Sequence, residues 1–171
     1  MGEKILKGRV FKVGDNISTD LLMPSFTMFG KVPQKEIKNY VFHENKPNFI
    51  EEVQKGDIIL AGKNFGCGSS RPATKNLIAL GLSCVVAESF SAIFFRNSIA
   101  LGFPLFKVED INNFVKEKEL IKVFPQKGYI QAVKNDKKKK IEPYPEFLMK
   151  IVEAGGLMPF FREDKSIKDI S

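Results

Sequence analysis

Residues that could do chemistry are concentrated in one segment, 61–71, which reads Ala-Gly-Lys-Asn-Phe-Gly-Cys-Gly-Ser-Ser-Arg. Its glycines allow a tight turn and let the backbone come close to a ligand. Ser69 and Ser70 stand where a helix is expected to begin, and the free N–H groups of a helix start favour an anion. The planar guanidinium of Arg71 suits a carboxylate. We therefore predict a carboxylate site formed by Gly68, Ser69, Ser70 and Arg71.

Other interpretations of this segment fit less well. A dinucleotide fingerprint would use the glycines of 66–68 and Glu88, about 20 residues further on, but Arg71 replaces its third glycine. Cys67 could act as a nucleophile only with His43, the single imidazole of the chain, and both residue types more often serve packing. One alternative of another class stays open, in which the turn captures an anionic metabolite in a non-catalytic regulatory module.

Composition limits the partners and cofactors. The chain has 27 Lys and Arg against 20 Asp and Glu, a net charge of +7 that favours anionic substrates or acidic partners. The lysines at 137–140 carry much of the excess and read as a solvated turn without interleaved aromatic residues, so we expect no nucleic-acid binding. Two cysteines, Cys67 and Cys84, are too few for a metal site held by this chain alone. Without a signal peptide or membrane-spanning run, a cytoplasmic protein is expected.

The pattern of apolar residues predicts one α/β domain. The domain would span 1–171, with a core over about 6–160 and a C-terminal tail at 161–171. Strands and helices that alternate from 58 to 108 predict parallel pairing in a mixed sheet flanked by helices. Strands are expected at 5–13, 58–61, 84–87, 104–108 and twice within 120–133, and helices at 34–44, 48–53, 73–80, 89–101, 110–118 and 145–154.

The segment 17–33 has no periodicity and is interrupted by Pro24, Gly30 and Pro33. Its apolar content is unusual for a surface loop. Such a loop is expected to cover or bind something.

Three segments in the same order and spacing resemble a known family. They are residues 14–20 (Gly-Asp-Asn-Ile-Ser-Thr-Asp), residues 62–71, and residues 87–97 (Ala-Glu-Ser-Phe-Ser-Ala-Ile-Phe-Phe-Arg-Asn). They are similar to the swivelling domain of the aconitase superfamily, especially to the separate small subunits of 3-isopropylmalate dehydratase and homoaconitase. The resemblance runs from about residue 6 to 160 and implies a β/β/α domain with a mixed, largely parallel sheet.

The resemblance also implies a hydro-lyase that is active only with a large subunit. That partner would carry a [4Fe–4S] cluster whose open iron acts as a Lewis acid on a hydroxy diacid, while this chain holds no cofactor. In the family, the residue matching Ser69 is the base that removes a proton. Ser70, Arg71 and Gly68 would hold the substrate carboxylate, and Asp20 would orient a positive group.

Substrate choice is implied by a departure from the family. After the proline that matches Pro24, isopropylmalate dehydratases usually have Ala or Gly and then Arg-Tyr-Leu. Aconitase uses an arginine in this loop to hold the third carboxylate of citrate, and homoaconitase also has an arginine there. Here that loop contains Phe26, Thr27, Met28 and Phe29, without an arginine. An alkyl-substituted malate is therefore expected, most simply 3-isopropylmalate in leucine biosynthesis, with homoaconitase and dimethylmalate-type dehydratase as alternatives. The apolar loop could equally dock on the large subunit.

Overall fold

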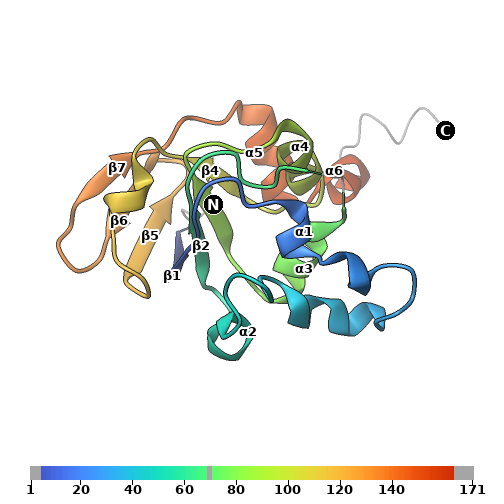
Figure 1. Cartoon of the computed structure of the whole chain (residues 1–171). Helices are drawn as coiled ribbons and strands as arrows, with labels where there is room; N and C mark the ends of the chain where they lie inside the picture. Colours follow the sequence, from blue (N-terminus) through green and yellow to red (C-terminus); the bar gives the residue numbers. More distant parts are fainter. Residues whose placement is uncertain (1–4, 69–70, 164–171) are drawn as a thin grey trace.

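The computed structural model describes residues 5–68 and 71–163 and contains a seven-stranded sheet with helices packed beside it (Figure 1). The strand order is β4-β3-β2-β1-β5-β6-β7, so the first strand lies in the middle. The strands are β1 (Leu6–Lys12), β2 (Ile58–Ala61), β3 (Cys84–Ala87), β4 (Leu105–Lys107), β5 (Leu120–Phe124), β6 (Tyr129–Ala132) and β7 (Lys138–Lys140).

The sheet has a parallel half and an antiparallel half that meet at β1. β1, β2, β3 and β4 pair in parallel, and β1, β5, β6 and β7 pair antiparallel. Every residue of β2 and β3 is buried, as their continuous apolar sequences predict for strands covered on both faces. The expected mixed α/β sheet is confirmed, and its antiparallel half has as many strand pairs as its parallel half.

The helices surround the parallel half of the sheet. Short 3-10 helices span Ser25–Thr27, Gln34–Tyr40 and Ile111–Asn113. The α-helices are α1 (Thr19–Leu22), α2 (Phe49–Glu52), α3 (Ala73–Ala79), α4 (Ala92–Ala100), α5 (Glu146–Glu153) and α6 (Leu157–Glu163).

Several elements differ from the prediction. The lysine run forms β7 instead of a turn, and the helices expected at 34–44 and 110–118 are present but are shorter and of the 3-10 type. A run of identical residues cannot show alternation, so only pairing with β6 reveals this strand. The four-residue α1 is too short for a periodic signal, and α6 follows two glycines that indicate a helix end. α6 crosses the boundary at 160 expected between core and tail.

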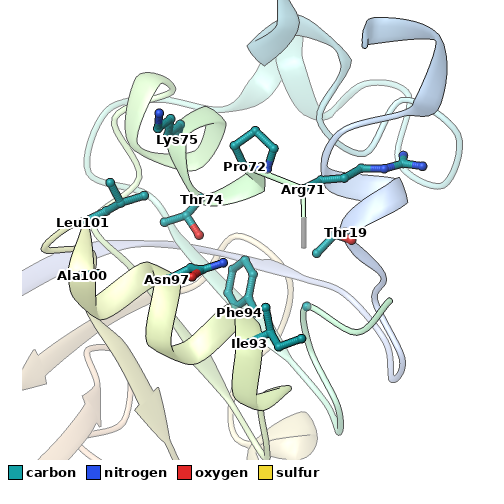
Figure 2. A pocket seen from close by; sticks show the side chains of 11 residues that line it. Thr19, Arg71, Pro72, Thr74, Lys75, Ile93, Phe94, Asn97, Ala100 and Leu101 are labelled. Carbon is teal, nitrogen blue, oxygen red and sulfur yellow. The ribbon is translucent and has the colours of Figure 1, made fainter. Parts of the chain in front are cut away.

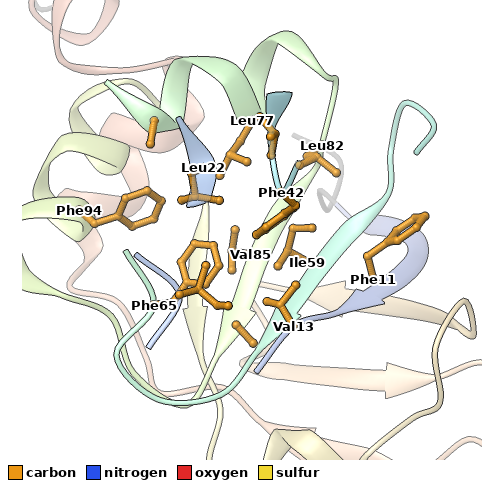
Figure 3. Close-up of a cluster of buried hydrophobic side chains, with 14 of the residues drawn as sticks. Phe11, Val13, Leu22, Phe42, Ile59, Phe65, Leu77, Leu82, Val85 and Phe94 are labelled. Atoms are coloured by element: carbon orange, nitrogen blue, oxygen red, sulfur yellow. The ribbon is translucent and has the colours of Figure 1, made fainter. Parts of the chain in front are cut away.

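Alternating side chains of the strands feed two buried clusters, one on each face of the sheet. Phe11, Ile59 and Val85 face a cluster that also contains Phe42 and Leu77 (Figure 3). The neighbouring strand residues face the opposite cluster, which contains Val10, Ile58, Val86, Ile121 and Ile130. The first cluster anchors the segments around the predicted site.

Gly8 in β1 lies against Gly56, in the turn before β2, and this close contact requires a residue without a side chain. A Cβ added to Gly8 would lie 2.1 Å from the carbonyl oxygen of Gly56, whereas one added to Gly14 would have nothing within 4 Å. Gly8→Ala should therefore destabilise the fold by about 1–3 kcal/mol through overpacking. Thermal unfolding of both variants measures this effect, with Gly14→Ala as the matched control. Equal melting temperatures of the two variants would contradict the predicted clash.

Candidate functional site

The glycine-rich segment leaves the end of β2 and runs beside residues 14–20. The amide of Asn16 donates to the carbonyl of Lys63 at 2.8 Å, and the amide of Thr19 donates to the carbonyl of Cys67 at 2.8 Å. A third hydrogen bond, from Gly66 N to the carbonyl oxygen of Ile17, lies between these two and measures 2.7 Å. The two segments are thus joined by their backbones, in a pairing that sequence periodicity does not reveal.

Side chains of the same segment fix the start of the turn. Asp15 Oδ1 accepts a hydrogen bond from the amide of Lys63 at 2.7 Å, and Asn16 Oδ1 accepts one from Asn64 Nδ2 at 2.9 Å. The Asp15 carboxylate fills the space above Gly62, where an added Cβ would lie 1.8 Å from Oδ1. Gly62 is therefore required for this close approach.

The third segment, 87–97, holds the turn from the other side. Ser89 Oγ accepts a hydrogen bond from the amide of Asn64 at 2.8 Å, and Ser91 Oγ donates to the carbonyl of Gly66 at 2.6 Å. Ser91 is the N-cap of α4, which begins at Ala92 and so starts later than the helix expected at 89–101. The ring of Phe94 covers Gly66 so closely that an added Cβ would lie 2.2 Å from it. All three segments of the family resemblance meet at this turn.

The guanidinium of Arg71 is held beside the turn. Its Nη1 donates to the carbonyl of Met23 at 2.7 Å and lies 3.1 Å from Asp20 Oδ1. Asp20 is in the first turn of α1, whose N-cap is Ser18. The Arg71 side chain is only 16% exposed, compared with 59% for Asp20. The arginine is thus held in place, while one side of its partner remains open to solvent.

The predicted serines lie outside the described residues. Ser69 and Ser70 fall in the gap between Gly68 and Arg71. Gly68 has a φ of +94°, a conformation that favours glycine, and lies near Thr19. α3 begins at Ala73, where the helix expected at 73–80 also begins.

A cavity of about 280 Å³ opens between α3 and α4, next to Arg71 (Figure 2). Thr74 and Asn97 give it polar groups, and Ile93, Phe94 and Leu101 make much of its surface apolar. Figure 2 shows the Arg71 guanidinium pointing away from Thr74 and Asn97. Arg71 and Thr19 also line the cavity.

The four residues of the predicted specificity loop have different environments. Thr27 is buried and its hydroxyl donates to the carbonyl of Pro24 at 2.7 Å, so it stabilises the loop itself. Phe26 packs against Tyr40, with ring centroids 5.2 Å apart, and Met28 packs against the core. Phe29 is 90% exposed. Of the four, Phe29 is the side chain that projects furthest into solvent.

Other candidate groups lie in packing environments. His43 contacts Phe26 and Tyr40 through ring edges. Burial raises the pKa of the Cys84 thiol, which therefore stays protonated, while Cys67 is half-buried in the turn.

Within 5–68 and 71–163, no three His, Cys, Asp or Glu side chains are grouped to hold a metal ion. No helix in these ranges is long and apolar enough to cross a membrane.

Residues 15–107, which contain the three segments around the turn except for Gly14, match the Aconitase C-terminal domain. The chain belongs to this family. The isopropylmalate/citramalate isomerase small subunit of Methanocaldococcus jannaschii is 42% identical over 160 residues, or 93% of this chain and 95% of that protein. The 3-isopropylmalate dehydratase small subunit of Clostridioides difficile is 42% identical over 155 residues, covering 90% and 94% of the two chains.

The fold agrees with this assignment to the aconitase family. A crystal structure titled 3-isopropylmalate dehydratase from Methanocaldococcus jannaschii has a TM-score of 0.87 and 31% sequence identity, and the match covers 98% of this chain and 99% of that one. The whole sheet and its helices thus follow an arrangement already seen in the family.

Four side chains that hold the turn were not predicted individually: Asp15, Asn16, Ser89 and Ser91. They all lie inside the segments that carry the resemblance. In the sequence, these residues stand out only as short polar residues close to glycines. Such residues are common in turns, where their side chains often bond to the neighbouring backbone.

The Asp15 contact gives a direct test of how the turn is held. Asp15→Ala removes the acceptor for the Lys63 amide, so hydrogen exchange at Lys63 should be about tenfold faster. Exchange measured by NMR on the folded chain reports this change. Asn135→Ala is a control, because Asn135 Oδ1 also accepts a backbone N–H, from Lys137, at another exposed turn. Unchanged exchange at Lys63 would show that backbone pairing alone holds the turn.

Proposed function

We propose that the chain is the small subunit of a hydro-lyase of the 3-isopropylmalate dehydratase type, acting in leucine biosynthesis. The observation that supports this most strongly is the convergence of all three family segments on one turn, with Arg71 fixed beside it. Relatives with this function match more than nine-tenths of the chain. A large partner subunit is part of the proposal, because those relatives are named as small subunits.

The chemistry would be shared between the two subunits. The large subunit would carry a [4Fe–4S] cluster, which supplies Lewis-acid activation of the substrate hydroxyl. This chain would bind the substrate carboxylate through Gly68, Ser70 and Arg71. Arg71 can present a fixed charge because the carbonyl of Met23 already orients its guanidinium.

Ser69 is proposed as the base that removes the proton next to the carboxylate. A serine hydroxyl is a very weak acid, so its anion needs nearby N–H groups and positive charge. The glycine-rich turn and Arg71 provide groups of both kinds next to Ser69 in the chain. Asp20 would limit the movement of Arg71 through their 3.1 Å contact.

The proposed substrate is a malate with an alkyl substituent, most simply 3-isopropylmalate. No arginine occurs between Arg9 and Arg71 to hold a third carboxylate, and the loop after Pro24 presents the exposed ring of Phe29 instead. The relative in Methanocaldococcus jannaschii is named for isopropylmalate and citramalate. Both compounds are alkyl-substituted malates, which supports an apolar contact in place of a charged one.

Activity should appear only when the chain is combined with its large subunit. We expect the complex, prepared without oxygen, to convert isopropylmalate, measured by the absorbance of the unsaturated diacid. Ser69→Ala should assemble normally and lower turnover about 10²–10⁴-fold, because it removes the base. Full turnover by Ser69→Ala would favour a non-catalytic anion-binding module, and an assembled, cluster-loaded complex inactive on every alkyl malate tested would contradict the proposal.

The role of Phe29 can be separated from general effects of charge. Phe29→Arg should shift the ratio of kcat/KM for homocitrate to that for isopropylmalate about tenfold toward homocitrate, because it offers a cation to a third carboxylate. Phe147→Arg is the matched control, since Phe147 is also exposed but lies on α5. An unchanged ratio in an assembled Phe29→Arg complex would assign the loop to subunit docking.

A further inference from the structure

The antiparallel half of the sheet has an exposed, positively charged face. Cross-strand partners point to the same side of a sheet. The register pairs Lys7 with Lys122, Lys122 with Gln131, and Gln131 with Lys138, which places these residues in one row across β1, β5, β6 and β7. Lys140 lies in the neighbouring row, opposite Tyr129. We call the four lysines of these two rows the basic face.

Helices cover this side of the sheet only over its parallel half. Lys7 and Phe11 point to the same side of β1, since they are four residues apart in a strand. Phe11 is fully buried in the cluster below the helices, whereas Lys7 is exposed. Lys138 and Lys140 are also exposed, and Lys122 is half-buried. On this side of β1, the sheet is therefore buried at Phe11 and open to solvent at Lys7.

The basic face has more positive than negative charge. One carboxylate lies at its row, since Asp136 Oδ1 accepts a hydrogen bond from Gln131 Nε2 at 2.8 Å. β5, β6 and β7 contain no acidic residue, and within 5–68 and 71–163 none of the four lysines forms a salt bridge. Arg9, the next residue on this side of β1, differs because it contacts Asp57 at 2.7 Å. Elsewhere Lys46 and Lys107 also have acidic partners. The basic face therefore concentrates unpaired charge.

Protection of a sheet edge explains only part of this pattern. Lysines on an edge strand prevent pairing with other chains, which accounts for Lys138 and Lys140 on β7. Lys7 and Lys122 lie on β1 and β5, which have strand neighbours on both sides. Edge protection does not require lysines there, so a partner of opposite charge explains the row better.

The surroundings of the lysines favour a protein partner over a nucleic acid. The Tyr129 ring stacks on Phe124 with centroids 4.6 Å apart, and Lys138 Nζ lies 4.6 Å from its centroid. This ring is therefore already engaged and offers a poor platform for a base. Leu120 and Val133 lie beside the row and are 39% and 38% exposed. Exposed apolar side chains with charged residues around them match the apolar core and polar rim of a protein interface.

We infer that the basic face docks on an acidic surface of the large subunit. This inference rests on the proposed function, which requires such a partner, and adds a second contact area to the one around the glycine-rich turn. Complementary charge would speed association and fix the orientation of the two subunits. Lys7, Lys122, Lys138 and Lys140 would supply the charge, and Leu120 and Val133 the apolar contact.

Lysine labelling of the assembled complex tests this contact directly. The free chain and the complex with the large subunit are acylated briefly, and labelling at each lysine is measured by mass spectrometry. We expect protection of the four lysines of the basic face in the complex. Lys35 and Lys55, which are exposed on other elements, serve as reference positions. Equal labelling of the basic face in the free chain and in an assembled complex would overturn the inference.

Charge reversal provides the second measurement. The double variant Lys122→Glu, Lys138→Glu should bind the large subunit about tenfold more weakly at low salt, with a smaller loss at high salt. The control Lys35→Glu, Lys55→Glu should bind like the wild type. Affinity equal to wild type for the Lys122→Glu, Lys138→Glu variant would overturn the inference, as would charge-dependent binding of a single-stranded RNA with unchanged subunit affinity.

These measurements are separable from the test of function. Turnover per assembled complex should be unchanged in the variant of the basic face, because Lys122 and Lys138 lie on strands apart from the glycine-rich turn. A wild-type complex that assembles with a protected basic face but converts no hydroxy diacid would contradict the proposed function alone. An active complex with an unprotected basic face would contradict the docking inference alone.

Discussion

The site depends on backbone pairing between two segments far apart in the sequence. Residues 14–20 follow β1 and residues 62–68 follow β2, and parallel pairing of these strands brings both segments to the same edge of the sheet. Because the contacts are backbone hydrogen bonds, they fix the path of the turn largely independently of its side chains. Gly62 and Gly66 then allow Asp15 and Phe94 to come closer than any other residue type would permit.

The segment that contains α1 and the loop after it holds the positive charge of Arg71 in one position. The guanidinium is held by a carbonyl of the loop after α1 and faces a carboxylate within α1. A mobile arginine would lose conformational entropy on binding a ligand, whereas this one has already lost much of it during folding. The position of α1, a helix of one turn, therefore matters more for ligand binding than its length indicates.

The sequence predicted the parallel half of the fold well because β2 and β3 are continuous apolar runs between helical segments. It failed where structure comes from pairing rather than pattern, as in β7, where four consecutive lysines hide any alternation. At the site, residue types identified Arg71 and the glycines. The supporting roles of Asp15 and Ser89 could not be predicted, since they depend on distances between segments separated by 48 and 25 residues.

The central position of β1 has a consequence for how the chain folds. β1 is synthesised first, yet its neighbours β2 and β5 begin at Ile58 and Leu120. The sheet therefore cannot close on both sides of β1 until more than two thirds of the chain has left the ribosome. Contacts between residues so far apart in sequence slow folding and leave apolar strand faces open meanwhile. Chaperone capture during synthesis is thus expected to act on the segment between β1 and β5.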